Sequence, residues 1–231
     1  MKSTHTITRY GQTWDIQVDD AIMENHLRLG LPCEHHMLDW MLTHIEPGGI
    51  WIDAGANVGN HAIPFSFRAD LVVAYEPMPD NFDLLVSNTS SRSNILPLRV
   101  GVSDKPGALY ARRGGTGHNC QWELTDAPSK DHPQADIPVV RIDDVVLQTH
   151  PVRVIKLDVE GMEEKALAGA WQTLRRDNPE IFAEIWGRRE LALITATLGT
   201  LGYKLIERFG HAPTYHFSTK PYKVTYTEPR P

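Results

Sequence analysis

Three groups of residues along the chain have the types and spacing to bind a polar cofactor. The first is an apolar strand that reaches Asp53 and runs into a turn with Gly55, Asn57 and Gly59, followed by Asn60 at a helix start. Glycines let the backbone approach a ligand closely, and a helix N-terminus offers unpaired amides to a carboxylate or phosphate. The acid before the glycines disfavours a pyrophosphate and suits an ammonium group. The turn is therefore predicted to cradle a nucleotide-type cofactor.

The second and third groups are acids at the ends of later apolar strands. Glu76, followed by Pro77, closes the run LVVAYE about twenty residues after the glycines, where a carboxylate is suited to bridging two ribose hydroxyls. Asp158 and Glu160 follow the run VIKL and share a face if that strand continues. Ligands of open α/β sheets lie beyond the carboxyl ends of the strands, so the three groups are expected to meet in one crevice. The plainer alternatives are a tight turn without a ligand, an acid at a helix start and a helix cap.

The elements that must position these residues alternate between strands and helices. Short apolar runs are separated by helical patterns, which predicts βαβ units and a mostly parallel, covered sheet. Strands are expected at 50–54, 71–76, 95–102, 152–159, 181–186, 203–209 and 214–217, and helices from about Asn60, around 82–86, over 162–175 and around 191–198.

Two segments depart from this alternation. Residues 1–49 are predicted to form an extension packed on the core, with a hairpin around Gly11 as a lid or edge addition and a helix at 37–45. Residues 103–136 show little periodicity, and connections this long are usually lids or binding loops. We therefore assign the acceptor to this long loop and the cofactor to a single domain over residues 50–231.

Composition describes an ordinary globular chain and disfavours several classes. The 231 residues are 41% hydrophobic and carry a net charge of −6, so nucleic acid is not expected as a partner. Cys33 and Cys120 stand far apart, which argues against a disulfide framework and fits a reducing cytoplasm. With no run of about eighteen apolar residues, no membrane span is expected. Asp143 and Asp144 lack a third ligand, so no metal is expected, and a homodimer stays open beside a monomer.

The ordered set of motifs resembles the FkbM family of S-adenosylmethionine-dependent methyltransferases. The resemblance spans roughly residues 50–186 and is carried by IDAGANVGN, YEPMPDNFDLL, GVSDKPG, RIDDV, IKLDVEGMEEKALAGA and PEIFAEI. It implies an α/β class I methyltransferase fold, a Rossmann-like sheet of seven mostly parallel strands, the last antiparallel, flanked by helices. It also implies S-adenosylmethionine as cofactor and O-methylation of a sugar, glycolipid or natural product, hence a small-molecule or glycan acceptor.

The resemblance also assigns cofactor contacts by position. The glycine turn falls where the methionine part is held, Glu76 where the ribose is held, and Ser103 with Asp104 where adenine is commonly held. Two departures, His61 at the helix start and Pro64, which shortens that helix, remove no ligand. The predicted cofactor-binding residues are Asp53, Gly55, Asn57, Gly59, Asn60, Glu76, Pro77, Ser103, Asp104 and Asp158.

Methyl transfer to an alcohol needs an aligned acceptor and a base that removes the hydroxyl proton. The candidate catalytic residues are Asp158, Glu160 and His118, the last because a histidine pKa lies near working pH. Glu184 either faces the crevice or pairs with Arg188. The aromatic residues suited to an acceptor ring are Trp122, Trp186 and Tyr215, with core packing the better prediction for Trp186.

Other functions on the same sheet remain as alternatives. A nicotinamide-dependent oxidoreductase is disfavoured because the GxGxxG spacing is missing and because Asp53 stands before the turn. A non-catalytic binding module keeps the cradle without the chemistry. Methylation of nitrogen or nucleic acid is disfavoured by the negative charge and by the sequence Asp158-Val159-Glu160-Gly161, which lacks an Asn/Asp-Pro-Pro-aromatic signature.

Overall fold

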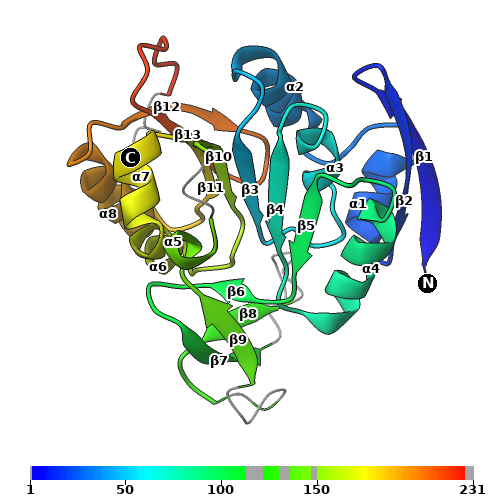
Figure 1. The fold of residues 1–231 in the computed structure, drawn as a ribbon, viewed down its shortest axis with the longest axis horizontal. Helices are drawn as coiled ribbons and strands as arrows, with labels where there is room; N and C mark the ends of the chain where they lie inside the picture. Colours follow the sequence, from blue (N-terminus) through cyan, green and yellow to red (C-terminus); the bar gives the residue numbers. More distant parts are fainter. Residues whose placement is uncertain (1, 113–121, 129, 131–135, 147–149, 227–231) are drawn as a thin grey trace.

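A mixed sheet of seven strands forms the centre of this computed structural model, which describes residues 2–112, 122–128, 130, 136–146 and 150–226 (Figure 1). The order across the sheet is β12-β13-β11-β10-β3-β4-β5, and β13 alone runs antiparallel to its neighbours in it, as predicted for the last strand. The strands are β3 (Ile50–Ala54), β4 (Leu71–Tyr75), β5 (Ile95–Leu98), β10 (Val152–Leu157), β11 (Glu180–Glu184), β12 (Lys204–Phe209) and β13 (Thr214–Ser218).

The central strands are mostly apolar because both faces of the sheet are covered. All five residues of β3 are buried, with Trp51 in one core cluster and Ile50 and Ile52 in the other. One face packs against α2 (His35–His44), α3 (Ala62–Phe65) and α4 (Pro79–Thr89); the opposite face packs against α5 (Ile142–Val145), α6 (Glu163–Gly169), α7 (Trp171–Asp177) and α8 (Arg188–Gly199) (Figure 1).

The predicted N-terminal hairpin is present, and it forms a two-stranded sheet of its own. Strands β1 (Ser3–Arg9) and β2 (Gln12–Val18) pair antiparallel and lie outside the central sheet (Figure 1). The Asn88 side chain on α4 holds this hairpin, accepting from the Gln17 N–H at 2.8 Å and donating to the Gln17 carbonyl at 2.9 Å. The hairpin is therefore a layer on α4, not an addition to the sheet edge.

Helix α1 (Ala21–Leu27) was not predicted, although the sequence contains its capping signal. The Asp20 side chain accepts hydrogen bonds from the N–H groups of Ile22 and Met23, which have no partner inside the helix. An acid at this position is the usual start of a helix, and the short helix it begins leads to the polar segment around Cys33 and Glu34.

The prediction of one long loop over 103–136 is wrong for the part of it that the structure describes. Strands β7 (Gly107–Arg112) and β8 (Glu123–Thr125) lie in this segment and join β6 (Gly101–Val102) and β9 (Ile137–Val140) in a second sheet with the order β6-β9-β7-β8 (Figure 1). Strands β6 and β8, with two and three residues, show too few alternations to be recognised, and their pairing depends on partners distant in sequence.

The helix predicted over 162–175 is interrupted at Ala170, between α6 and α7. Asp143 caps the second piece: its Oδ1 accepts from the N–H and the hydroxyl of Thr173, and its Oδ2 accepts from the N–H of Gln172. Asp143 therefore has a structural role. Within the described ranges no group of three or more His, Cys, Asp or Glu side chains is placed to hold a metal ion, and no helix is long and apolar enough to cross a membrane.

Candidate active site

The main cavity lies beyond the carboxyl ends of β3, β4 and β10, where the second sheet closes over them. Its lining combines carboxylates and backbone turns on one side with apolar side chains on the other. Gly55, Asn57, Tyr75, Glu76, Pro77, Met78, Asn81, Gly101, Val102, Trp122, Leu124, Asp158, Val159, Glu160 and Met162 line it.

The glycine turn after β3 has the backbone that its composition requires. Gly55, Asn57 and Gly59 have φ values of 81°, 48° and 95°, in the left-handed region that glycine adopts most easily. The N–H groups of Gly55 and Ala56 both donate to the Tyr75 carbonyl at 2.9 Å. A Cβ atom on Gly55 would lie 1.8 Å from the Asp158 carbonyl oxygen, so the turn passes directly against the strand that presents Asp158.

Gly55→Ala is expected to distort this contact and to weaken binding of S-adenosylhomocysteine by at least about 10-fold, since the clash is with backbone that cannot rotate away. The matched control is Gly202→Ala, at a φ of 86° with no atom within 4 Å of the added Cβ. Both substitutions place a side chain at a positive φ, so Gly202→Ala measures the effect of that backbone strain without a clash. Calorimetric titration and thermal unfolding of both variants measure the difference; equal behaviour would contradict the close approach.

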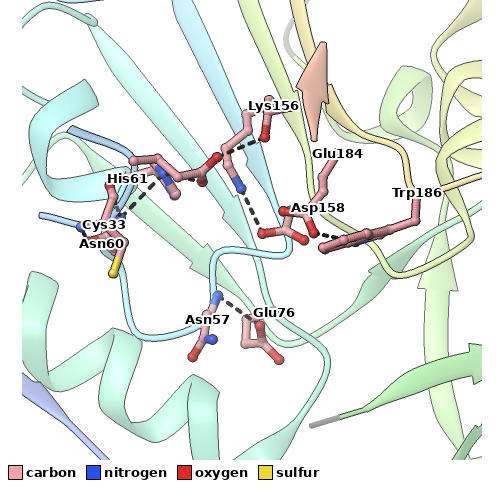
Figure 2. A network of polar contacts seen from close by, with 11 residues as sticks. Cys33, Asn57, Asn60, His61, Glu76, Lys156, Asp158, Glu184 and Trp186 are labelled. Atoms are coloured by element: carbon pink, nitrogen blue, oxygen red, sulfur yellow. Dashed lines mark hydrogen bonds and ion pairs between the residues drawn. The ribbon is translucent and has the colours of Figure 1, made fainter. Parts of the chain in front are cut away.

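Glu76 is buried at the end of β4 and holds the turns on either side of it. Its Oε2 accepts from the Asn57 N–H and its Oε1 from the Met78 N–H, each at 2.9 Å, as Figure 2 shows for Asn57. Burial raises the pKa of Glu76 to about 7, although these two hydrogen bonds favour the carboxylate. Each oxygen keeps a lone pair, so the group is arranged to accept two neighbouring hydroxyls.

Lys156 carries a buried charge behind the cavity. Its side chain is 1% exposed, and its Nζ lies 3.2 Å from Oδ2 of Asp158, which is 27% exposed (Figure 2). Burial lowers the pKa of Lys156, but the charges of Asp158 and Asp53 outweigh burial and the net shift is upward. Lys156 is therefore a charged residue that fixes Asp158 at the edge of the cavity.

Asp53 lies beside Lys156 as its neighbour across the β3–β10 pair. It is fully buried, and burial raises its pKa, while Lys156 and His61 oppose that shift. Neither of its oxygens has a well-aligned hydrogen-bond partner among the described residues. Asp53 thus keeps hydrogen-bond acceptor capacity next to the turn although Lys156 lies beside it, which suits a cationic group at this end of the site.

The N-terminal extension completes the polar network from the other side. Oε2 of Glu34 lies 3.1 Å from His61 Nε2, and its Oε1 accepts from the Thr214 hydroxyl at 2.8 Å. Burial alone would raise the pKa of Glu34, but the hydrogen bond and charge of His61, with the charge of Lys156, lower it to about 2. The extension therefore contributes a carboxylate to the same buried network as the central strands.

A second depression, which is more open to solvent and is called the side chamber, adjoins the main cavity and shares Leu124 and Glu160 with it. Glu184 and Trp186 line the side chamber, and the Trp186 Nε1–H donates to Glu184 Oε1 at 2.7 Å (Figure 2). Glu184 thus faces the crevice. The prediction of core packing for Trp186 is wrong, because its side chain is 48% exposed; Trp122 lines the main cavity, and Tyr215 is buried in the core.

The structure brings together six of the residues predicted for the site: Gly55, Asn57, Glu76, Pro77, Asp158 and Glu160. Strand β10 ends at Leu157, so Asp158 and Glu160 meet in the cavity through a loop in which Glu160 has a φ of 53°, not through a continued strand. Helix α6 begins after Met162 at its N-cap, and Glu160 does not occupy that capping position.

The other predicted residues that the structure describes lie outside the cavity lining. Asn60 exchanges two hydrogen bonds with the Cys33 backbone, at 2.9 and 3.1 Å, and so joins the N-terminal extension to the turn. Gly59 packs against Leu85 on α4. Ser103 donates to Asp104 at 3.1 Å beside the cavity, where Gly101 and Val102 take the lining positions. His118 lies outside the described residues.

Sequence reasoning missed the apolar wall and the buried charges. Met78, Val102, Leu124 and Met162 give the main cavity flat apolar surface of the kind that a purine ring packs against. Leu124 had no periodic signal, since β8 has three residues. The sequence did contain a signal for Lys156, because a lysine inside an otherwise apolar buried strand requires an oppositely charged partner.

The arrangement as a whole fits a nucleoside with a charged tail. The apolar wall is suited to a planar base, Glu76 is suited to the ribose hydroxyls, and the Gly55 turn with Asp53 behind it is suited to an ammonium-bearing tail. These features are those of S-adenosylmethionine. A cofactor with a diphosphate fits this site less well, because Asp53 stands near the place where a pyrophosphate would bring further negative charge.

Comparisons with known proteins agree with this geometry. The methyltransferase FkbM domain matches residues 53–205. Over 148 residues the chain is 29% identical to the hexuronic acid methyltransferase AglP of Haloferax volcanii, a match that covers 63% of this chain and 59% of that relative's length. The chain therefore spans less than two thirds of this curated relative.

Solved structures show the same fold. A methyltransferase FkbM from Methylobacillus flagellatus superposes with a TM-score of 0.54 at 18% identity, over 83% of this chain and 52% of that one. A Streptococcus mutans protein solved in complex with S-adenosylhomocysteine superposes with a TM-score of 0.51 at 14% identity, over 80% of this chain and 95% of that one. The chain belongs to the FkbM methyltransferase family and carries an S-adenosylmethionine-dependent methyltransferase domain of the class I fold.

Proposed function

We propose that the protein methylates a hydroxyl oxygen of a sugar or a similarly hydroxylated acceptor. The observation that carries the proposal is the position of Asp158: a partly exposed carboxylate, fixed by Lys156, at the edge of the main cavity and next to the side chamber. The name of the AglP relative, a hexuronic acid methyltransferase, supports a sugar as the acceptor class. The side chamber then holds the acceptor and the main cavity the cofactor.

Asp158 is the proposed general base, and Lys156 is its positioning residue. Bound S-adenosylmethionine supplies an electrophilic methyl group. An acceptor hydroxyl donates to the free oxygen of Asp158, while Lys156 holds Oδ2. As the new O–CH3 bond forms and the S–CH3 bond breaks, the hydroxyl proton passes to Asp158, leaving a methyl ether and S-adenosylhomocysteine. The wall of Met78, Leu124 and Met162 excludes water from this line of transfer.

Glu160 is the second candidate base, because it lines both the main cavity and the side chamber. A non-catalytic binding module is the competing function, since it would retain the cavity without the proton transfer. The two functions differ in what they require of Asp158: a module needs its charge at most for affinity, whereas the enzyme needs its basicity.

The test is turnover of Asp158→Asn and Glu160→Gln beside the wild-type protein, with methyl glycosides as acceptors and S-adenosylhomocysteine release as the readout. We expect Asp158→Asn to lower kcat by about 100- to 10,000-fold and to change S-adenosylhomocysteine affinity by less than about 10-fold. If Glu160→Gln causes that loss and Asp158→Asn does not, Glu160 is the base. Cofactor binding by the wild-type protein without turnover on any hydroxylated acceptor would favour the binding module.

A further inference from the structure

The residues that line the side chamber indicate which charge the acceptor carries. This inference rests on the proposed function. The chamber lies between the second sheet on one side and the segments that follow β10 and β11 on the other, next to the proposed base. This is the region beyond the carboxyl ends of parallel strands where such folds bind their ligands. Leu124 and Glu160 form the boundary between the chamber and the main cavity. An acceptor whose hydroxyl reaches Asp158 across this boundary has the rest of its surface in the chamber.

The charges that line the chamber are mostly negative. Five glutamates line it: Glu123, Glu160, Glu163, Glu184 and Glu190. Arg112 is the one cation among its described lining residues, and its Nε donates to Glu123 Oε2 at 2.6 Å. Arg112 and Glu123 therefore compensate each other. The other four carboxyl groups have no further cation among the described residues that line the chamber, and a carboxylate that enters would meet those of them that are ionised as like charge.

Trp186 gives the chamber a flat aromatic surface. Its hydrogen bond to Glu184 fixes the indole edge, and the side chain stays 48% exposed at the chamber (Figure 2). Aromatic faces attract both the C–H surface of a sugar ring and a cation within about 6 Å of the ring. A fixed indole beside several carboxyl groups is thus suited to a hydroxylated ring that also carries a positive charge.

Burial also raises the pKa values of two of these acids, so that their ionised forms are stabilised when a cation binds beside them. Burial raises the pKa of Glu163 to about 7. The charge of Asp158 raises it further, and the hydrogen bond from the Gly161 N–H lowers it. Burial also raises the pKa of Glu184 to about 8, with Asp158 and Glu34 acting in the same direction and Lys156 and Trp186 against it. An ammonium group favours the ionised carboxylates, so its entry at neutral pH should release protons from them.

We propose that the acceptor is an amino sugar, a hydroxylated ring bearing an ammonium group, and that uronic acids are rejected. The proposal departs from the acceptor named for AglP. It predicts that charge, more than ring shape, separates good acceptors from poor ones in this protein. Selectivity then comes from the carboxylates that favour the cation and from the same carboxylates repelling an anion.

The test compares three probes that differ in one substituent: methyl glucosaminide, methyl glucoside and methyl glucuronide. Each is titrated into the full chain saturated with S-adenosylhomocysteine. The glucosaminide should bind about 10-fold more tightly than the glucoside and the glucuronide about 10-fold more weakly, with both differences reduced by salt. Titration in two buffers of different ionisation enthalpy at pH 7 should show proton release for the glucosaminide alone.

Substitutions of residues that line the chamber test whether the chamber causes the preference for the glucosaminide over the glucoside. Glu184→Gln keeps an oxygen for the Trp186 N–H but cannot ionise when an ammonium group binds, and Glu190→Gln removes a second ionisable group; each should reduce the glucosaminide-to-glucoside ratio by about 3- to 10-fold. The matched control is Glu46→Gln, an exposed position away from the chamber, which should leave the ratio unchanged. A merely structural effect would weaken both probes equally and leave the ratio alone.

Several outcomes overturn the proposal without touching the proposed function. The glucuronide binding as well as the glucosaminide, or being methylated as fast, would do so. So would binding of none of the three probes to a protein that still binds S-adenosylhomocysteine and methylates another hydroxylated acceptor. Failure to methylate any hydroxylated acceptor would instead remove the proposed function itself.

Discussion

Lys156→Met should lower the free energy of unfolding by about 3–5 kcal/mol at pH 8, and kcat by at least about 100-fold. The lysine is 1% exposed, lies 3.2 Å from Asp158, and is surrounded by Asp53, Glu34 and Glu184. Removing one partner of a buried ion pair leaves the other charges without compensation, which costs more than the pair itself contributes. Asp158 also loses the contact that holds it at the cavity.

The deficit of this variant should shrink as the pH falls. In the wild-type protein the pKa of Lys156 is raised above its ordinary 10.5, so its contribution to stability is complete below that value and is lost only as the pH rises through the folded-state pKa. Between about pH 5 and pH 8 the lysine is therefore fully charged. In the variant the buried carboxyl groups can avoid their charge by binding protons, which is easier at pH 5 than at pH 8.

Urea unfolding at the two pH values measures the deficit, and release of S-adenosylhomocysteine measures turnover. Lys204→Met is the matched control, since Lys204 also lies on a strand of the central sheet but is exposed, and it should change stability by less than about 0.5 kcal/mol. A deficit below about 1 kcal/mol for Lys156→Met, or one that grows toward acidic pH, would show that Lys156 does not compensate the buried acids.

Much of the fold was predictable because its strands are buried on both faces. Runs such as 50–54 and 152–157 are mostly apolar, and turn residues separate them from helices, so local sequence and global packing agree. The second sheet was not predictable in the same way. Its strands β6 and β8 have two and three residues, too few for a period, and they form because distant partners hold them.

The residues of the candidate site also differ in whether they could be predicted from the sequence. Gly55, Glu76 and Asp158 were found because strand ends in an open α/β sheet converge, which is a rule of topology. Glu34 was not found, because its place beside His61 depends on how the N-terminal extension folds back, and no local pattern encodes a contact across 27 residues. Asn60 was assigned to the cofactor for its position at the turn, whereas its amide serves the Cys33 backbone.

Glu76→Ala should weaken S-adenosylhomocysteine binding by about 100-fold or more. The carboxylate is arranged to accept two ribose hydroxyls while it holds the Asn57 and Met78 N–H groups. Hydrogen bonds to a charged group contribute about 1.5–3 kcal/mol each, and truncation also leaves both backbone N–H groups without their acceptor. The exposed Glu164→Ala on α6 serves as the control and should bind as the wild-type protein does.

The pH dependence of binding distinguishes a ribose contact from a purely structural role of Glu76. Its pKa in the cofactor-free protein is raised from 4.5 to about 7, so ionisation costs folding stability as the pH rises from 4.5 toward 7, and hydroxyl donors offset that cost. Affinity for S-adenosylhomocysteine should therefore rise with pH, approaching about 10-fold per unit below pH 7, and level off above it. Glu76→Gln should flatten this rise even though Glu163, whose pKa is also about 7, is still present. Wild-type affinity that is constant from pH 6 to 8, or a Glu76→Gln profile that keeps the full slope, would mean that the ionised carboxylate of Glu76 does not bind the ribose.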